Sequence, residues 1–565
     1  ARIQHRGPDE SLISVVNEHV AIGVNRLEIV GGVKGSQPIY NEKSTLALVC
    51  NGEIYNHKKL QKKYCKMHKF RTTSDVEIIL HLYEELGDAF ISKLEGQFAF
   101  ILVDTIRKHV VIGRDRFGIL PLFLAYTPDG LLISSEIKGI MGSQMLKNLS
   151  FDLQEILNTW FFYGPKAPKT CFHEIQQLPA GTISTYSYID KRRTENCYWS
   201  PSTKEYAQKR RVSLKTLKRR LEASVKQCLQ GSYRAGVYVS GGIDSSIIAA
   251  LAKKLSSKPP ILFGIAFSDA TYDERAHQSS LAAYLHCPLK QIFISTKDLE
   301  SHFMDCVYHV EVPLTRSAPI PLMLLSRFVH KTGIKFVLSG EGADELFLGY
   351  PVFKQNLSSI EDKYAEKISF LPYFNSQVGG NKYSPEVPNS LFRHSLGQEN
   401  INRLRLVEIE TKLSRYLLAT QGDRVSTANS VEQRFPYLNT DVVSAAYTLK
   451  REDLITQSLN KVALRNSLKN ELPNTLLYRP KKGYLAPDRS LAETLILSTK
   501  WSRLFSKKRT RKAGIFVYDQ LSKLVQKART HDVLSEEEAR FLIFVSSTHL
   551  LYEFYVDPKT KNISI

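Results

Sequence analysis

The chain has 565 residues, of which 43% are hydrophobic and 24% charged. These values are ordinary for globular proteins and exclude a fibrous or wholly disordered chain. At about 150 residues per domain, the length allows three or four domains, or two large ones. Lysine and arginine number 77 against 56 acidic residues, which gives a formal charge of +21. No apolar run approaches the length of about 18 residues that a membrane-spanning helix needs.

The positive charge is the unusual bulk property. Basic clusters such as Lys507–Lys512 are short and lack interleaved aromatic residues, so solvated faces or an anionic substrate explain them better than nucleic acid. The seven cysteines are scattered and form no CxxC pair, which argues against a disulfide framework or a zinc ribbon. With no signal-peptide core in the first thirty residues, a reducing cytoplasm is the expected compartment.

The first half of the chain combines apolar strands with one clear helix. Strands are predicted over Leu46–Cys50, Gln97–Asp104 and His109–Gly113. Asp75–Leu86 carries apolar residues at helical spacing and ends at Gly87. The pattern predicts a compact α+β unit.

Strands and helices alternate in the second half, after a polar linker predicted over Trp199–Arg211. This alternation predicts a parallel, doubly wound sheet. The predicted helices are Leu214–Leu229, Asp244–Leu255, Arg275–Leu285 and Pro321–His330. The predicted strands are Gly236–Val239, Ile261–Phe267 and Lys335–Leu338.

The sharpest local signal is the glycine-rich turn Ser240–Ser246, which follows a strand and opens a helix. Paired glycines let consecutive N–H groups converge on an anion, and the helix N-terminus adds positive potential. The turn therefore predicts a pyrophosphate cradle, although it lacks the lysine of a Walker A loop. The plainer alternative is a strand–turn–helix joint capped by Asp244 or Ser245.

A second glycine-containing loop, Leu338–Glu345, also ends a predicted strand, where open α/β sheets bind ligands. It brings three carboxylates close together, and at a phosphate site these need a cation. Asp244 and Asp344 are therefore predicted to share Mg²⁺. The alternative is that these acids only complement helix dipoles.

These two loops resemble the ATP pyrophosphatase loop and its companion loop in asparagine synthetases. Further matches follow in the family's order from about residue 2 to residue 490. They are Arg6–Asp9, Arg26–Val30, Asn51–Asn56, Ser74–Asp75, Gly113–Gly118, Ser430–Pro436 and Arg479–Gly483. The whole chain resembles a glutamine-hydrolysing asparagine synthetase of the bacterial type.

The resemblance implies two domains. Residues 1–205 would form an α+β Ntn-hydrolase domain, an αββα sandwich, that frees ammonia from glutamine. Residues 206–565 would form an α/β domain, with a doubly wound parallel sheet and added helices, that adenylates the side chain of aspartate. Ammonia would cross an internal tunnel and displace AMP, so the chain would be a carbon–nitrogen ligase. The implied ligands are glutamine or ammonia, aspartate, ATP and Mg²⁺, with no membrane or nucleic acid, and a homodimer is left open.

In the glutaminase half, the resemblance implies that Arg26 clamps the glutamine α-carboxylate and Asp75 the ammonium. The amide of Asn51 and the N–H of Gly52 would form the oxyanion hole. Local sequence alone favours a hairpin turn at Asn51-Gly52, and the flanking motifs reverse that choice. The pocket would be completed by main-chain groups near Leu27, Ile29, Val30 and Glu53.

In the synthetase half, Glu341 would serve in forming the acyl-adenylate, and Lys481 would offset charge near the α-phosphate. Without its flanking residues, Lys481 would be an ordinary surface lysine. Lys461 is a weaker second choice, with a helix-surface charge as the alternative. The ATP site would comprise Ser240, Gly241, Gly242, Asp244 and Ser245 at the phosphates, Tyr238 and Ile265 at the adenine, and Ser339 and Gly340 along the nucleotide.

The chain departs from the family pattern at its start. The family's glutaminase nucleophile is an N-terminal cysteine whose α-amine serves as the base, whereas this chain begins with Ala1. Since Arg26, Asn51, Gly52 and Asp75 are present, we expect a missing first strand and helix rather than a lost glutaminase. The residues as written are expected not to hydrolyse glutamine, because Cys50 lies within a strand and has no terminal amine to act as the base. Free ammonia would then be their nitrogen donor.

Smaller departures concern the acceptor. Pro436–Asn439 stands where asparagine synthetases often read Pro-Phe-Leu-Asp, and Glu311–Ala318 matches only in part. Relatives with this architecture close β-lactam rings or amidate other carboxylates. Aspartate is therefore the expected acceptor, and an amidotransferase or lactam-type synthetase acting on another carboxylate is the alternative. A further hypothesis, an RNA-binding protein that uses the same glycine-rich loop, would leave the motifs within residues 2–140 unexplained.

Overall fold

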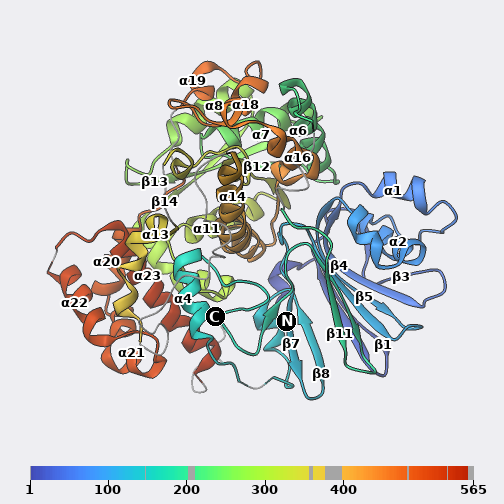
Figure 1. Ribbon diagram of the computed structural model, residues 1–565, viewed down its shortest axis with the longest axis horizontal. Helices are drawn as coiled ribbons and strands as arrows, with labels where there is room; N and C mark the ends of the chain where they lie inside the picture. Colours follow the sequence, from blue (N-terminus) through green and yellow to red (C-terminus); the bar gives the residue numbers. More distant parts are fainter. Residues whose placement is uncertain are drawn as a thin grey trace.

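The computed structural model describes residues 2–146, 148–201, 210–355, 360–375, 398–479, 483–530 and 532–557. Figure 1 shows three lobes: a sheet-rich lobe from the first half, a lobe around a parallel sheet, and a helical lobe from the end of the chain. The predicted domain boundary between residues 205 and 206 falls outside the described residues and stays a prediction.

The first lobe is built on a six-stranded antiparallel sheet in the order β11-β10-β6-β5-β4-β3. A hairpin, β1-β2, and a three-stranded sheet, β8-β7-β9, accompany it. The strands are β1 (Glu10–Asn17), β2 (Val20–Arg26), β3 (Ile39–Tyr40), β4 (Leu46–Ile54), β5 (Gly96–Asp104), β6 (His109–Arg114), β7 (Phe123–Thr127), β8 (Gly130–Ser134), β9 (Gln176–Gln177), β10 (Thr182–Ser187) and β11 (Arg193–Cys197). The helices are α1 (His57–Tyr64), α2 (Ile78–Leu86), α3 (Ile137–Ile140) and α4 (Leu153–Phe162).

Strand alternation gives the six-stranded sheet two apolar faces, because successive side chains point to opposite sides. Phe98 and Phe100 of β5 pack with Leu80 of α2 in one core. Ala99 and Val103 of the same strand belong to a second core that also contains residues of β2 and β7. The sheet thus lies between helices and further strands, and the expected α+β sandwich is confirmed.

The second lobe contains a five-stranded, all-parallel sheet in the order β14-β13-β12-β15-β16. All seven residues of β13 are buried, as expected for a parallel strand covered on both faces. The strands are β12 (Gly236–Tyr238), β13 (Ile261–Phe267), β14 (Leu289–Ile294), β15 (Phe336–Leu338) and β16 (Glu432–Arg434). The expected α/β architecture with a parallel sheet is confirmed.

The helices of the second half agree closely with the periodicity of the sequence. The predicted ones are α6 (Leu214–Cys228), α7 (Ile243–Leu255), α8 (Arg275–Leu285) and α11 (Pro319–Lys331). The others before the helical lobe are α9 (Thr296–Ser301), α10 (Phe303–Val310), α12 (Ala343–Leu346), α13 (Ile360–Ile368), α14 (Gln398–Glu408), α15 (Val425–Thr427), α16 (Thr440–Thr448), α17 (Arg451–Leu454), α18 (Val462–Ser467) and α19 (Asn474–Leu477). A π-helical segment, Ile409–Arg424, joins α14 to α15.

The helical lobe comprises α20 (Asp488–Leu497), α21 (Lys507–Ala513), α22 (Tyr518–Arg529) and α23 (Glu536–Leu551). Helix α4 from the first half enters this lobe, where the Trp160 ring contacts Phe541 and Phe544 of α23. Lys367 of α13 donates to the carbonyls of Trp160 and Phe161 at 2.7 and 3.3 Å. The buried amine of Lys367 therefore caps the C-terminal end of α4.

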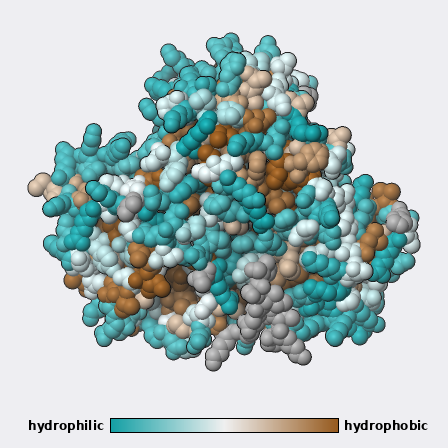
Figure 2. Space-filling model, turned by 180° about the vertical axis from the view of Figure 1, so that it is seen from behind, coloured by the Kyte–Doolittle hydropathy of each residue, from teal (hydrophilic) through white to brown (hydrophobic). Residues whose placement is uncertain are grey.

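The surface is mostly polar. The face shown in Figure 2 is largely hydrophilic, with separate hydrophobic patches. On α21, Arg509 pairs with Glu553 and Lys512 with Asp557, so part of the Lys507–Lys512 cluster is balanced locally. Among the described helices, none combines the length and apolar character needed to cross a membrane. All seven cysteines are free thiols.

Candidate functional site

The two glycine-containing loops meet in one cavity of about 400 Å³ at the carboxyl ends of β12, β13 and β15. A Cβ atom on Gly340 would lie 2.9 Å from the backbone nitrogen of Ser245, so the second loop rests directly against the first. At this close approach a larger residue would push the loops apart. The parallel sheet thus unites two segments that lie about a hundred residues apart in sequence.

Most of the predicted ATP-site residues line this cavity. They are Tyr238, Ser240, Gly242, Asp244, Ser245, Ile265, Ser339 and Gly340, and the predicted Glu341 and Asp344 join them. Gly241 is not among the lining residues: it has a φ of +73°, and its carbonyl accepts from Arg479 Nη1 at 2.7 Å. Lys481 lies outside the described residues.

The first loop leads into the N-terminus of the thirteen-residue helix α7. Ser245 Oγ accepts from the backbone nitrogen of Ser240 at 3.3 Å and donates to the carbonyl of Gly242 at 3.1 Å. These bonds hold the turn closed at the mouth of the helix, where backbone N–H groups and the helix dipole favour an anion.

Lys461 lies between the two acids that were predicted to bind Mg²⁺. Its Nζ is 2.5 Å from an oxygen of Asp244 and 2.5 Å from an oxygen of Asp344, and its side chain is fully buried. The alternative of a helix-surface charge at Lys461 is therefore wrong. Asp244 Oδ1 is buried without a hydrogen-bond partner among the described residues, so this carboxylate retains one oxygen suited to a cation.

Further cations line the cavity and were not identified from the sequence as nucleotide-site residues. Lys412, on the π-helical segment, places its Nζ 3.5 Å from the centre of the Tyr350 ring. The Tyr350 hydroxyl donates to Glu345 at 2.6 Å. Desolvation raises the pKa of Glu345 to about 8, and the charge of Asp344 adds to this effect. The remaining lining cations are Arg316, Arg465 and Arg479.

A second cavity, of about 200 Å³, opens in the first lobe beside β2 and β4. All the predicted glutamine-site residues line it: Arg26, Leu27, Ile29, Val30, Asn51, Gly52, Glu53 and Asp75. Asn51 and Gly52 lie inside β4, so the hairpin turn favoured by local sequence is wrong. Gly52 has a φ of +122°, and a Cβ there would meet the Gln97 carbonyl oxygen at 2.0 Å. The backbone can pass Gln97 only with a glycine at this position.

The charged residues of the second cavity are held by the backbone around them. Asp75 Oδ2 accepts from the Ile54 nitrogen at 2.5 Å, and burial raises the pKa of this carboxyl. Arg26 Nη2 donates to the carbonyls of Val30 and Gly32 at 3.1 and 2.8 Å. Both side chains are less than a tenth exposed. Both side chains are therefore held by the backbone rather than free to rotate.

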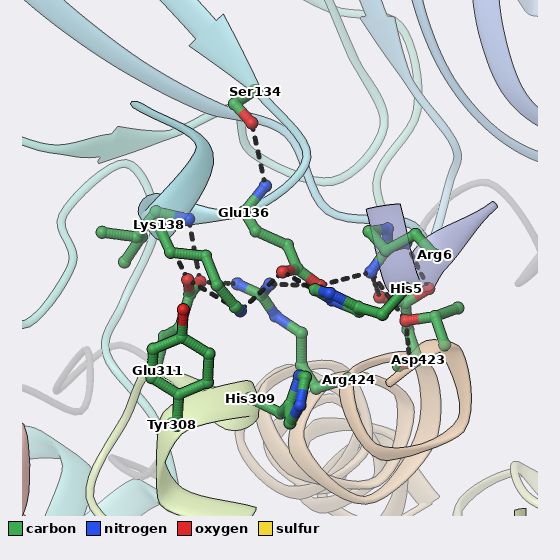
Figure 3. Close-up of polar contacts among 12 residues, drawn as sticks. His5, Arg6, Ser134, Glu136, Lys138, Tyr308, His309, Glu311, Asp423 and Arg424 are labelled. Carbon is green, nitrogen blue, oxygen red and sulfur yellow. Dashed lines mark hydrogen bonds and ion pairs between the residues drawn. The ribbon is translucent and has the colours of Figure 1, made fainter. Parts of the chain in front are cut away.

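The second half of the chain supplies the rear wall of this cavity, through Asp423, Thr427, Glu432, Gln433 and Phe435. Figure 3 shows how the two halves are joined there: side chains from the start of the chain, from the segment around Glu136 and from the helices of the second half converge. Arg6 Nη1 lies 3.0 Å from Glu136, 2.9 Å from Asp423 and 2.7 Å from Thr427.

The same network continues away from the cavity. Lys138 lies 2.5 Å from Glu136 and 3.1 Å from Glu311, and Arg424 donates to Glu311 at 2.8 Å. Although burial opposes it, Lys138, His5 and Arg6 hold the pKa of Glu136 well below its usual value. Sequence reasoning assigned Arg6 to a motif but missed its partners, because they lie 130 and 417 positions away.

Gln433 of β16 lines both cavities. Its backbone carbonyl accepts from Gln97 Nε2 at 2.9 Å, which ties β16 to β5 of the first lobe. Next to it, Arg434 forms a 2.7 Å ion pair with Glu53 in the second cavity. The motif Ser430–Pro436 therefore contains the strand, β16, at which the two cavities adjoin.

The comparisons with known proteins agree with this geometry. The model of the family described as asparagine synthase matches residues 216–550, and that of the glutamine amidotransferase domain matches residues 1–199. Asparagine synthetase B [glutamine-hydrolyzing] of Escherichia coli K12 is 29% identical over 501 residues, covering 85% of this chain and 77% of that protein. Asparagine synthetase [glutamine-hydrolyzing] 1 of Bacillus subtilis 168 is 28% identical over 531 residues, covering 86% and 83%.

Among solved structures, the allosteric regulatory enzyme of purine biosynthesis is similar over 52% of this chain and 76% of that one. Its sequence identity is 14% and its TM-score 0.28, values too low to carry an argument.

Proposed function

Because the chain belongs to the asparagine synthase family, we propose that it amidates L-aspartate to L-asparagine with ATP, through a β-aspartyl-AMP intermediate. The products would be AMP and pyrophosphate, which makes the chain a carbon–nitrogen ligase. The observation that carries this proposal is the contact between Gly340 and Ser245, since it places both loops on one nucleotide-sized cavity.

The phosphates of ATP would lie on the turn at residues 240–245, at the N-terminus of α7. Tyr238 and Ile265, which line the same cavity, would bracket the adenine. Attack of the aspartate carboxylate on the α-phosphorus would expel pyrophosphate. The cations around the cavity would stabilise the charge that develops on the leaving group. Glu341 and, outside the described residues, Lys481 keep their proposed catalytic roles.

The residues present fit a magnesium ion that accompanies ATP. Asp244 and Asp344 would hold it, and Lys461 would keep the two carboxylates together. When bound, Mg²⁺ would neutralise phosphate charge and favour departure of pyrophosphate. Lys461 itself would orient Asp244 at the phosphate end of the cavity.

The second cavity would bind glutamine, with Arg26 at the α-carboxylate, Asp75 at the ammonium, and Asn51 and Gly52 at the oxyanion. Cys50 also lines it, but burial raises the pKa of this thiol well above its usual value, which disfavours the reactive thiolate. Either glutamine or free ammonia would be the nitrogen source. Ammonia released in this cavity would pass Gln433 to reach the acyl-adenylate. A cytoplasmic location and a homodimer stay predictions from the sequence.

The test is pyrophosphate release by the whole chain with ammonia as nitrogen donor, across a panel of amino-acid carboxylates. We expect release that depends on aspartate and yields asparagine. Release with a different carboxylate only would instead support the alternative, a related amidotransferase or lactam-type synthetase. The Glu341→Gln variant should lose activity at least tenfold, whereas Glu222→Gln, which alters a carboxylate on α6 that pairs with Lys254 and does not line the cavity, should not.

A further inference from the structure

A cluster of two histidines and two glutamates lies outside both cavities, on the helical layer of the first lobe. It comprises Glu42, His68, His81 and Glu84, each of which offers one ligand atom within 4.8 Å of the others. Glu42 lies between β3 and β4, His68 follows α1, and His81 and Glu84 are neighbours on α2. In Figure 1, α1 and α2 form the outer edge of this lobe, away from the other two lobes.

Both imidazole rings turn the same nitrogen toward the same two carboxylates. His81 is fully buried, and its Nδ1 lies 3.1 Å from Glu84 Oε2 and 3.8 Å from Glu42 Oε2. The Nδ1 of His68 lies 3.5 Å from an oxygen of each glutamate. The two ring centres are 4.6 Å apart. Four potential donor groups therefore converge from three separate segments of the chain.

The opposite nitrogen of each ring faces another carboxylate. His68 Nε2 lies 2.7 Å from Glu85, and His81 Nε2 lies 3.5 Å from Glu77, too far for a hydrogen bond among the described residues. Glu77 is itself fixed, because its Oε2 accepts from the Thr72 nitrogen at 2.7 Å. In metal sites a ligating histidine almost always donates its other N–H to such an acceptor, which directs the free lone pair at the ion. With that tautomer, the Nδ1 lone pair of His68 would point at the carboxylates of Glu42 and Glu84 and repel them unless a cation lay between.

The glutamates are also oriented by fixed donors. Glu84 Oε1 accepts from Asn41 Nδ2 at 2.8 Å, which leaves Oε2 toward the histidines. Glu42 Oε1 accepts from the Lys69 backbone nitrogen at 2.8 Å. Both glutamates are therefore oriented by donors of the surrounding chain, whereas His68 is oriented by the exposed Glu85. The four candidate ligands thus lie close together, and most of them are oriented by a hydrogen-bond partner on the side away from the others.

We propose that Glu42, His68, His81 and Glu84 form a zinc site of the structural kind. Two imidazole nitrogens and two carboxylate oxygens suit Zn²⁺, whereas Mg²⁺ and Ca²⁺ prefer oxygen ligands alone. Four protein ligands would close the coordination shell, as in sites that stabilise a fold rather than activate water. The ion would crosslink three segments: the one after α1, through His68; helix α2, through His81 and Glu84; and the turn before β4, through Glu42.

The test uses the full chain, purified without a polyhistidine tag and stripped of metal with EDTA. Co²⁺ is titrated while visible absorption is recorded, and Zn²⁺ is then added to displace it. We expect saturation near one equivalent, an absorption band typical of a four-coordinate site, and a rise of the melting temperature with Zn²⁺. His68→Gln and Glu84→Gln should each weaken Zn²⁺ binding at least tenfold.

His173→Gln is the matched control, because His173 is an exposed histidine 3.6 Å from a single carboxylate, Asp152. It should bind Zn²⁺ like the wild type. The fully buried His81 is left unchanged, so loss of folding does not confuse the result. Binding that is equal in the wild type and in both site variants would overturn the proposal. So would an absence of saturable binding below millimolar metal, which would mean that protons alone bridge these side chains.

Discussion

The two cavities are built in different ways. The first, which we propose as the nucleotide cavity, has its walls within the second half of the chain, from Tyr238 to Leu485, at the ends of parallel strands. The second, which we propose as the glutamine cavity, takes its front from the first 135 residues and its rear wall from residues 423–435. The first cavity is therefore formed by one half of the chain, whereas the second forms only when the two halves pack together.

The largest effect is expected at Lys461 in the nucleotide cavity. Lys461→Met would leave Asp244 and Asp344 facing each other without their shared cation. Breaking a buried ion pair on one side costs about 3–5 kcal/mol, and we expect pyrophosphate release to fall at least a hundredfold. Urea unfolding and the pyrophosphate assay measure the two effects. Lys226→Met, at an exposed position on α6, should change neither; equal behaviour of the two variants would show that Lys461 is dispensable.

A smaller and more selective effect is expected where the halves dock. Arg6→Met would take from Asp423 its ion pair with Arg6, while Glu136 keeps Lys138, at a cost of about 3 kcal/mol in the free energy of unfolding. Because Arg6 lines only the glutamine cavity of the two, ammonia-dependent pyrophosphate release should stay within a few-fold of wild type. The exposed Arg2→Met is the control. A matching loss of ammonia-dependent activity would mean that the two sites are not separable.

The smallest effect is a pH dependence in the same docking region. Desolvation, reinforced by Lys138 and His5 and opposed by Glu136, lowers the pKa of His309 to about 3. Between pH 6.5 and pH 3 the unfolded chain binds a proton that the folded chain excludes, so stability falls as the pH falls through this window. His309→Asn removes that dependence.

Relative to wild type, the His309→Asn variant should therefore gain about 2 kcal/mol between pH 7 and pH 5, as measured by urea unfolding at each pH. The exposed His173→Asn should show a much smaller change. If both variants shift by the same amount, the burial of His309 does not control the acid sensitivity of this region.

The same contrast explains what could be predicted from the sequence. The strand–turn–helix around Ser240–Ser246 is local, so residue periodicity gave α7 and β13 to within a residue or two. Arg26, Asn51 and Asp75 were found through short motifs, and they do line one cavity. The position of Lys461 between two acids was not predictable, since its partners lie 217 and 117 positions away and local sequence makes it an ordinary lysine.

Asn51-Gly52 shows the opposite failure. The dipeptide is a strong local hairpin signal, but β5 pairs with β4 along its whole length and carries the chain through this point in an extended strand. Long-range pairing overrode a local preference. The dipeptide correctly indicated that Gly52 needs a positive φ, but this φ occurs inside a strand and not in a turn.

Helix α4 has a practical consequence for protein engineers. It precedes the linker in sequence, yet Trp160 lies among the rings of α23 and Lys367 caps its last turn. In a chimera joined at residues 202–209, α4 would come from one parent protein and the aromatic rings of α23 that pack against it from the other. Splicing ahead of Asp152, the N-cap of α4, would keep the helix with these rings but would separate β10 from β6 and β9 from β7, with which they pair, so a crossover at either place breaks native contacts.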